Sequence, residues 1–270
     1  MIKKMMIMEK DMVKEVIIKE GRRIDDRDFK DYREIKIERG IVKNAEGSAL
    51  VEIGGTKVIA GVKLEPGDPF PDTPNEGVLV VNAEFVPFSF PEVLPGPPDE
   101  NAIELARVID RIIRESEAID LEKLQINNTK KVWKVMLDII VLDNDGNMKD
   151  AATLASIAAL LDTRFPSYKI ESEEEIKVDY TIKTEEKLPI KRIPFGVTVA
   201  KIAGKLMVDP NLIEEEAADA ILTVGGFEEN SKLFLCALQK AGNKGFTYDE
   251  VIQAVDFGLE VGKSFVKMLK

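Results

Sequence analysis

Three arginines, Arg107, Arg111 and Arg114, follow one another at intervals of four and three residues. At about 100° per residue of an α-helix, their side chains fall within about 60° of one another. Arginine presents a planar fork of N–H donors that matches phosphate oxygens two at a time, so this stripe could hold a nucleic-acid backbone. The alternative is a solvated face closed by ion pairs, because Glu104 lies three residues before Arg107 and Glu115 lies four after the second arginine.

A proline-rich loop and an amphipathic helix must position these arginines. Pro97 and Pro98 hold the chain extended, and Asp99 can then cap the first free amide groups of a helix. Glu100 follows at the position where the positive end of the helix dipole favours a carboxylate. The apolar side of the helix, opposite the arginines, carries Leu105, Val108, Ile109 and Ile112. We therefore expect a helix that begins near residue 100 and packs this side on the core.

The composition is that of a soluble globular protein. Of the 270 residues, 44% are hydrophobic and 32% are charged, which allows one large core or two smaller ones. No apolar run reaches the roughly 18 residues of a membrane span, and charges interrupt residues 1–20 every few positions. We therefore expect a cytoplasmic protein without membrane contact.

The residue counts exclude several kinds of active site. The chain has no histidine and a single cysteine, Cys236, which stands in the apolar run LFLCAL and is expected to fill the core. The usual zinc and iron ligand sets, and any nucleophile that depends on histidine, are thereby excluded, so we expect neither a metal nor a cofactor. The net charge of −11 argues against an all-over basic coat for nucleic acid. Any such contact must come from a local basic strip or from a shared site.

Hydrophobic periodicity and turn residues predict an α+β protein. The predicted strands cover residues 34–39, 48–53, 57–64, 77–85, 131–142, 195–201, 205–208, 219–224 and 232–238, with an exposed edge strand or hairpin at 171–186. The predicted helices cover residues 1–20, the arginine segment, 150–161, and 247 to the C-terminus. Strands are followed by a helix twice, which indicates two related halves. We expect a helical extension at 1–20, a first half at 21–165 and a second half at 166–270.

Five blocks of sequence follow one another along the chain. They are GRRIDDRDFKDYR (21–33), ENAIELARVIDRIIRESEAIDLEKL (100–124), KKVWKVMLDIIVLDNDGN (130–147), DAATLASIAALL (150–161) and GVTVAKIAGKLMVDPNLIEEEAADAILTV (196–224). Together they resemble the ribonuclease PH family over roughly residue 21 to the C-terminus. Within that family they are most similar to archaeal exosome subunits of the forty-two type. The resemblance implies an RNase PH-like fold and 3′-to-5′ RNA breakdown, in which inorganic phosphate attacks the terminal linkage and nucleoside diphosphates are released.

The resemblance also implies which parts of a catalytic site are present. Catalytic relatives follow the buried strand with a glycine-glycine-threonine/serine-arginine stretch that holds the attacking phosphate, whereas this chain has residues 146–149, GNMK, at the matching positions. Met148 lacks the hydroxyl, and Lys149 replaces a fork of donors by a point charge. Of two family aspartates six residues apart, Asp209 is present and the second is Glu215. Asp209 before Pro210 is equally well explained as a turn residue.

The resemblance therefore predicts a subunit without catalytic residues of its own. In this subunit type Arg107 and Arg111 match helix arginines that face a partner's active site and hold single-stranded RNA. The implied partners are a catalytic RNase PH-like subunit, alternating with this chain in a ring of six, and RNA-binding cap subunits. Two alternatives stay open: an active phosphorolytic homohexamer that uses Lys149 in an untypical way, and a purely structural ring spacer without RNA contact.

Overall fold

The computed structural model describes residues 2–89 and 93–270 of the chain, and it confirms the predicted α+β class. In that part of the chain the helices are α1 (Ile2–Glu20), α2 (Glu100–Glu115), α3 (Met148–Asp162), α4 (Leu212–Ala217) and α5 (Tyr248–Leu269), with a 3-10 turn at Leu121–Leu124. None of these helices is long and apolar enough to cross a membrane.

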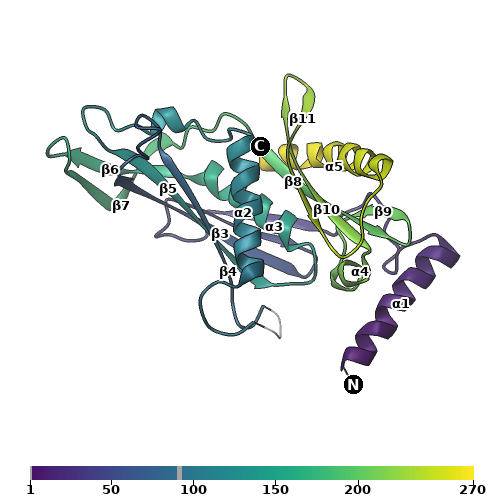
Figure 1. The fold of residues 1–270 in the computed structure, drawn as a ribbon. Helices are drawn as coiled ribbons and strands as arrows, with labels where there is room; N and C mark the ends of the chain where they lie inside the picture. Colours follow the sequence, from purple (N-terminus) through teal and green to yellow (C-terminus); the bar gives the residue numbers. More distant parts are fainter. Residues whose placement is uncertain (1, 90–92) are drawn as a thin grey trace.

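The strands form two main sheets and one hairpin (Figure 1). The five-stranded sheet has the order β1 (Ile35–Arg39), β2 (Gly47–Ile53), β3 (Thr56–Gly67), β5 (Val132–Asp143), β4 (Val78–Phe85). The four-stranded sheet has the order β11 (Lys232–Ala241), β10 (Ala220–Glu229), β8 (Pro194–Ile202), β9 (Lys205–Val208). Neighbours are antiparallel except for the parallel pair β4 and β5, which α2 connects. The hairpin β6 (Arg164–Ile170) and β7 (Ile176–Lys187) extends away from both sheets.

Helix α3 lies in the core and joins the two halves, because it packs on β2 and β3 of one sheet and on β8 of the other. Its sequence is rich in alanine, and all eleven residues from 150 to 160 are buried, as expected for a helix that is covered all round. The close approach also needs Gly47, where a Cβ atom would lie 2.3 Å from the Thr163 hydroxyl. The small-residue segment at 150–161 therefore forms most of α3, the central helix of the molecule.

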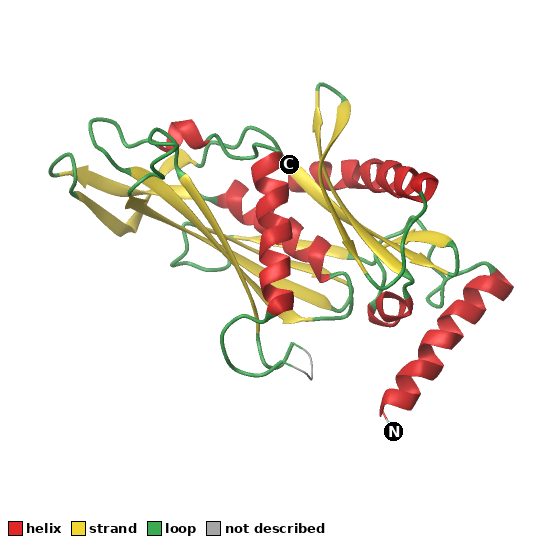
Figure 2. Ribbon diagram, viewed as in Figure 1, coloured by secondary structure: helices red, strands yellow, loops and turns green. Residues whose placement is uncertain are grey.

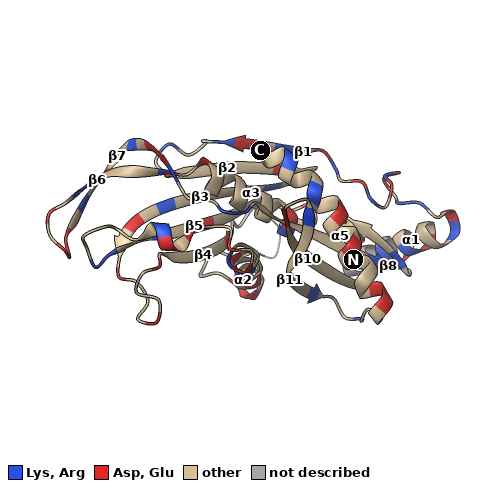
Figure 3. Ribbon diagram, turned by 90° about the horizontal axis from the view of Figure 1, so that it is seen from above, with Lys and Arg blue, Asp and Glu red and all other residues tan. Residues whose placement is uncertain are grey.

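Helix α2 stands between β4 and the β10–β11 hairpin, which Figures 2 and 3 show from two sides. It begins as predicted: the Asp99 carboxylate accepts a hydrogen bond from the Ala102 amide at 2.8 Å. The predicted apolar side is buried, with Ile109 and Ile112 fully inaccessible to solvent. Burial of each such side chain stabilises the fold by about 1.5–3 kcal/mol, which fixes the rotation of the helix and turns its arginines outward.

Several expectations need correction. Cys236 on β11 is only half-buried, because β11 is an edge strand, so the expected core position is wrong. Strand β10 continues to Glu229, five residues beyond its predicted end, because a bulge at Gly225–Gly226 lets the pairing with β11 continue. Helix α4 was not predicted, although Asn211 and Glu214 form a capping box at its start. The N-terminal helix docks as expected, with Val13 and Ile17 buried in a small cluster against the four-stranded sheet.

Candidate nucleic-acid interface and a closed carboxylate network

Helix α2 and the β10–β11 hairpin enclose a groove of about 350 Å³. We call it the arginine groove; it is lined by Glu100, Ile103, Glu104, Arg107, Val108, Arg111 and Ile112 of α2 and by Thr223, Gly225, Ala237, Leu238 and Gln239 of the hairpin. The two arginines that sequence analysis selected thus line the same cavity. They stand one helical turn apart, so their side chains are neighbours on one face.

Arg107 and Arg111 are both exposed, and no hydrogen bond or ion pair joins either of them to another residue in the described part of the chain. Glu104, the expected intrahelical partner of Arg107, instead pairs with Lys149 of α3 at 2.7 Å. The alternative of a face closed by intrahelical ion pairs therefore does not describe these two side chains. Both side chains line the groove, and no carboxylate of the described residues is bound to them.

Arg114 differs from the other two arginines of the stripe. It forms an ion pair with Asp110 at 2.7 Å and donates a hydrogen bond to the Leu79 carbonyl at 3.2 Å. The hydrogen bond that Arg114 donates to the Asp110 carboxylate raises the pKa of Arg114 above its ordinary value. This arginine does not line the groove, and it ties α2 to the start of β4.

The floor of the arginine groove is apolar. The buried Val108 and Ile112 of α2 line it there, and Gly225 of β10 lets Ile112 approach closely, since a Cβ atom at Gly225 would lie only 2.7 Å from Ile112. Two guanidinium groups above an apolar floor suit a phosphodiester whose sugar or base covers the floor. At the N-terminal end of the groove Glu100 adds negative charge, which limits the cationic surface to about the span of two arginines.

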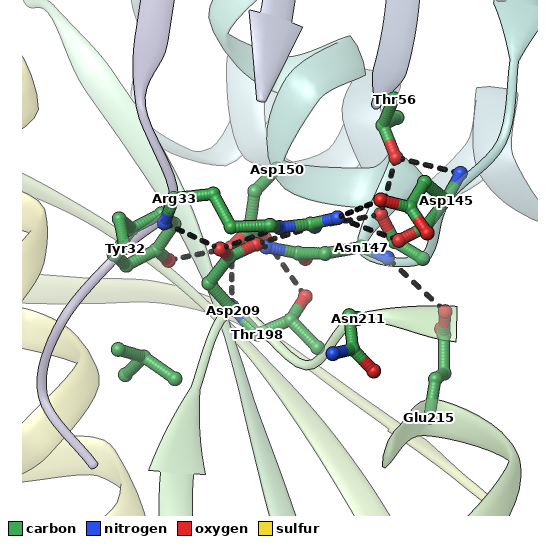
Figure 4. Close-up of polar contacts among 12 residues, drawn as sticks. Tyr32, Arg33, Thr56, Asp145, Asn147, Asp150, Thr198, Asp209, Asn211 and Glu215 are labelled. Atoms are coloured by element: carbon green, nitrogen blue, oxygen red, sulfur yellow. Dashed lines mark hydrogen bonds and ion pairs between the residues drawn. The ribbon is translucent and has the colours of Figure 1, made fainter. Parts of the chain in front are cut away.

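The loop that matches the family's phosphate-binding stretch forms a second cluster, which we call the carboxylate network. It consists of Tyr32, Arg33, Asp145, Asn147, Asp150, Thr198, Asp209 and Glu215 (Figure 4). Asn147 precedes α3 in the left-handed conformation, with a φ angle of 57°. Its side-chain amide donates to Asp150 at 2.9 Å and to Asp209 at 2.8 Å. Its backbone N–H donates to the Glu215 carboxylate at 3.1 Å.

Arg33 binds this loop from the other side. Its guanidinium donates to the carboxylate of Asp209 at 2.8 and 2.9 Å, to the carbonyl of Asp145 at 2.6 Å and to that of Gly146 at 3.0 Å. A further bond of 3.2 Å reaches the Asp145 carboxylate. Burial works to raise the pKa of Asp209, but the hydrogen bonds from Arg33 hold it below its ordinary value.

Asp150 lies at the centre of the network and is fully buried. It accepts hydrogen bonds from the Tyr32 hydroxyl at 2.6 Å and from the amide and hydroxyl of Thr198 at 3.0 and 2.8 Å. Burial raises the pKa of Asp150 from 3.8 to about 6, although these donors oppose the shift. Burial likewise raises the pKa of Tyr32 well above its ordinary value. The network thus joins Asp150 of α3 to Thr198 of β8 and to Tyr32, and no ion pair to Asp150 is formed within the described part of the chain.

Carboxylates of the chain itself occupy the part of this loop where an anion could otherwise bind. The Asn147 amide at the start of α3, a position suited to anions, already donates to Glu215. Met148 offers no hydroxyl, and Lys149 points to Glu104 on α2 instead of into the loop. Asp209 matches a family aspartate and was equally well explained as a turn residue. In the structure it has the positive φ of a turn residue, 47°, and its carboxylate also binds Arg33 and Asn147.

Sequence reasoning missed the arginines that complete this network. Some arginines of the segment 21–32 pair with aspartates of the same segment, since Arg22–Asp26 and Arg27–Asp25 pair at 2.7 Å. Arg27 also reaches Asp209, and the fully buried Arg23 holds Glu214 with two hydrogen bonds of 2.9 and 2.5 Å. The high density of arginines in GRRIDDRDFKDYR was the sequence signal for such ion pairs, but the partners of Arg23 and Arg27 lie more than 170 residues away.

Two family models match the chain, 3′ exoribonuclease family domain 1 over residues 31–166 and domain 2 over residues 192–261. The Exosome complex component Rrp42 of Thermococcus gammatolerans is 47% identical over 253 residues, which cover 94% of this chain and 91% of that relative. The protein of the same name from Pyrococcus horikoshii is 49% identical, with 94% and 90% covered.

Among solved structures, a chain of the Archaeoglobus fulgidus exosome with RNA bound to the active site is similar throughout. It superposes with a TM-score of 0.87 at 39% sequence identity, covering 98% of this chain and 99% of that chain. Fold, matched domains and sequence identity agree, and the predicted RNase PH-like fold is confirmed. The chain belongs to the 3′ exoribonuclease family, of which ribonuclease PH gives the fold its name.

Proposed function

We propose that this protein is a non-catalytic ring subunit of an archaeal exosome, which binds single-stranded RNA and completes the active site of a catalytic RNase PH-like partner. The RNA contacts come from Arg107 and Arg111 in the arginine groove. Similarity to archaeal proteins named Rrp42, and to an exosome with RNA in its active site, supports this assignment.

The observation that carries the proposal is the state of the two arginines. A surface arginine on a helix usually finds a carboxylate three or four residues away, and Arg114 does so with Asp110. Arg107 and Arg111 have no such partner in the described part of the chain, although Glu104 and Glu115 stand at the right spacing. Two neighbouring unpaired guanidinium groups above an apolar floor form a site for an anionic chain molecule.

The carboxylate network supports a role without catalysis by this chain. A phosphate at the start of α3 would have to displace Glu215 from the Asn147 amide and would lie close to Asp150 and Asp209. Like charges at such distances oppose one another strongly in a buried site. The attacking phosphate is therefore bound on the partner subunit, and this chain contributes to the path of the RNA.

The proposed role as a ring subunit also determines the partners. A catalytic subunit alternates with this chain in a ring of six, and RNA-binding cap subunits cover the ring. The net charge of −11 is compatible with RNA binding because only the lining of a shared channel must be basic.

The proposal is tested with the ring assembled from this chain and its catalytic partner. Arg107→Ala with Arg111→Ala is expected to weaken binding of single-stranded RNA by about 1–3 kcal/mol per lost charged contact. The slope of log affinity against log salt concentration should become shallower by about 1.4, as expected when contacts to two phosphates of a single strand are lost. Affinity is measured at several salt concentrations in phosphate-free buffer, so that the RNA is not degraded.

Arg114→Ala is the matched control, because it removes the same charge from the same helix but from a side chain that already has partners. It should change RNA affinity much less than the double substitution. Equal affinity and equal salt slope for the double variant would favour the structural spacer. Release of nucleoside diphosphates by this chain alone would favour the active homohexamer.

A further inference from the structure

Lys149 of α3 follows directly after the loop of the carboxylate network, and an ion pair joins it to a residue of the arginine groove. Its ammonium group lies 2.7 Å from the Glu104 carboxylate, with the lysine side chain 18% and the glutamate side chain 43% exposed. Glu104 lines the arginine groove, whereas Lys149 does not. The lysine therefore reaches the groove through the glutamate and contacts its contents only indirectly.

The position of Lys149 is electrostatically unfavourable for the helix that carries it. It is the second residue of α3, where the positive end of the helix dipole disfavours a cation by about 0.3–1 kcal/mol. No hydrogen bond connects its side chain to the loop of the carboxylate network in the described structure. Glu104 offsets this cost directly. Burial raises the pKa of Glu215 on α4, and the positive charge of Lys149 opposes that rise. The lysine is thus held by the Glu104 carboxylate on α2.

Glu104 has a second possible partner within its own helix. It precedes Arg107 by three residues, a spacing at which glutamate and arginine side chains meet on a helix surface. A glutamate released from Lys149 could turn to Arg107 and occupy the guanidinium that otherwise faces the groove. In the described part of the chain the Glu104 carboxylate pairs with Lys149, and Arg107 has no partner.

We propose that Lys149 is a positioning residue for RNA binding: it holds Glu104 away from Arg107 and so keeps that guanidinium free for a phosphate. This inference rests on the proposed function, since it assumes that Arg107 contacts RNA. It assigns a role to the lysine and the glutamate together, although Lys149 itself does not line the groove. The ion pair from Lys149 on α3 then keeps the RNA site on α2 available.

The experiment is a double-substitution cycle in the assembled ring, with single-stranded RNA in phosphate-free buffer. Lys149→Met should weaken RNA binding by about twofold to fivefold, the strength of a partly exposed ion pair formed in competition with the phosphate. Glu104→Gln removes the carboxylate that competes for Arg107 and should raise affinity slightly. The combined variant should bind like Glu104→Gln alone, because no carboxylate remains for the lysine to hold. Lys149→Arg keeps the charge and should retain the affinity of the unmodified chain.

A loss of affinity from Lys149→Met that is equally large with and without Glu104 would overturn the inference, since the lysine would then act on RNA by its own charge. Unchanged affinity of Lys149→Met would overturn it as well. Arg107→Ala distinguishes this failure from that of the proposed function. If Arg107→Ala weakens binding while Lys149→Met does not, only the role of Lys149 is wrong. If Arg107→Ala has no effect, the proposed function fails and this inference fails with it.

Discussion

Arg33 and Arg107 show how one residue type serves two purposes in this molecule. The guanidinium group of Arg33 forms five hydrogen bonds to the side chains and backbone around Asp209 and Asp145, and the side chain is 10% exposed. Arg107 is exposed and has no partner in the described structure. A saturated arginine stabilises the fold that surrounds it, whereas an unpaired one on a groove remains available to a ligand.

The carboxylate network predicts that the chain cannot be made phosphorolytic by restoring the two most obvious side chains. Met148→Thr with Lys149→Arg returns a hydroxyl and a guanidinium, but Glu215 still occupies the Asn147 amide. Phosphate-dependent release of nucleoside diphosphates from RNA should therefore remain undetectable for this variant alone. Appreciable activity in the assay would show that the loop opens more easily than its hydrogen bonds imply.

Asp150 should make stability depend on pH in a direction opposite to that of most carboxylates. Its pKa is raised to about 6 by burial, so the folded state binds the proton more tightly than the unfolded state. Its contribution to the free energy of unfolding is therefore greatest below about pH 4 and is lost as pH rises through 6, by about 2–3 kcal/mol. Urea unfolding at pH 4, 5, 6 and 7 tests this against Asp150→Asn, which cannot titrate. The difference between the two proteins should shrink or change sign as pH rises, and a constant difference would contradict the assignment.

At the scale of elements, α2 was well predicted because every signal in it is local. Asp99, the apolar residues and the three arginines specify its start, its buried side and its exposed side within about 20 residues of sequence. The ionic partners could not be predicted in the same way. Glu104 stands three residues from Arg107 but pairs with Lys149, 45 residues away, and Arg33 pairs with Asp209, 176 residues away. Such contacts depend on how helices and sheets pack, which periodicity within one segment does not contain.

The start of α2 gives a prediction at this scale. Asp99→Ala removes the acceptor that satisfies the Ala102 amide, which lies 2.8 Å from the Asp99 carboxylate. The free energy of unfolding should fall by about 1 kcal/mol, as for other N-cap losses. Asp72→Ala is the control, because Asp72 is an exposed loop aspartate without a partner in the described structure. Chemical denaturation of both variants measures the difference, and an equal loss in the two would show that the cap contributes nothing.

At the scale of the whole molecule, sequence alone indicated strands followed by a helix in two repeats, and the two sheets on either side of α3 have this arrangement. The division into 1–20, 21–165 and 166–270 stays a prediction. What the sequence could not provide is the groove, because its two walls come from α2 and from a hairpin more than 100 residues later. The arginines were identifiable, but the surface opposite them was not.

The surface of the chain predicts assembly with a different subunit in preference to identical copies. Large apolar side chains are exposed on the edge strand β11, where Phe234 and Leu235 are 41% and 45% accessible, and on the loop before α2, where Leu94 is 82% accessible. Exposed apolar groups on an edge strand favour association. Six identical chains would also each bring a charge of −11 to the ring, and this repulsion is relieved by alternation with a less acidic partner.

Light scattering should therefore give a hexameric mass only when the catalytic partner is present, and the mass of the chain alone should stay below that of a hexamer at low salt. A stable homohexamer at low salt would show that apolar contacts outweigh the charge repulsion and would return the homohexameric alternative to consideration.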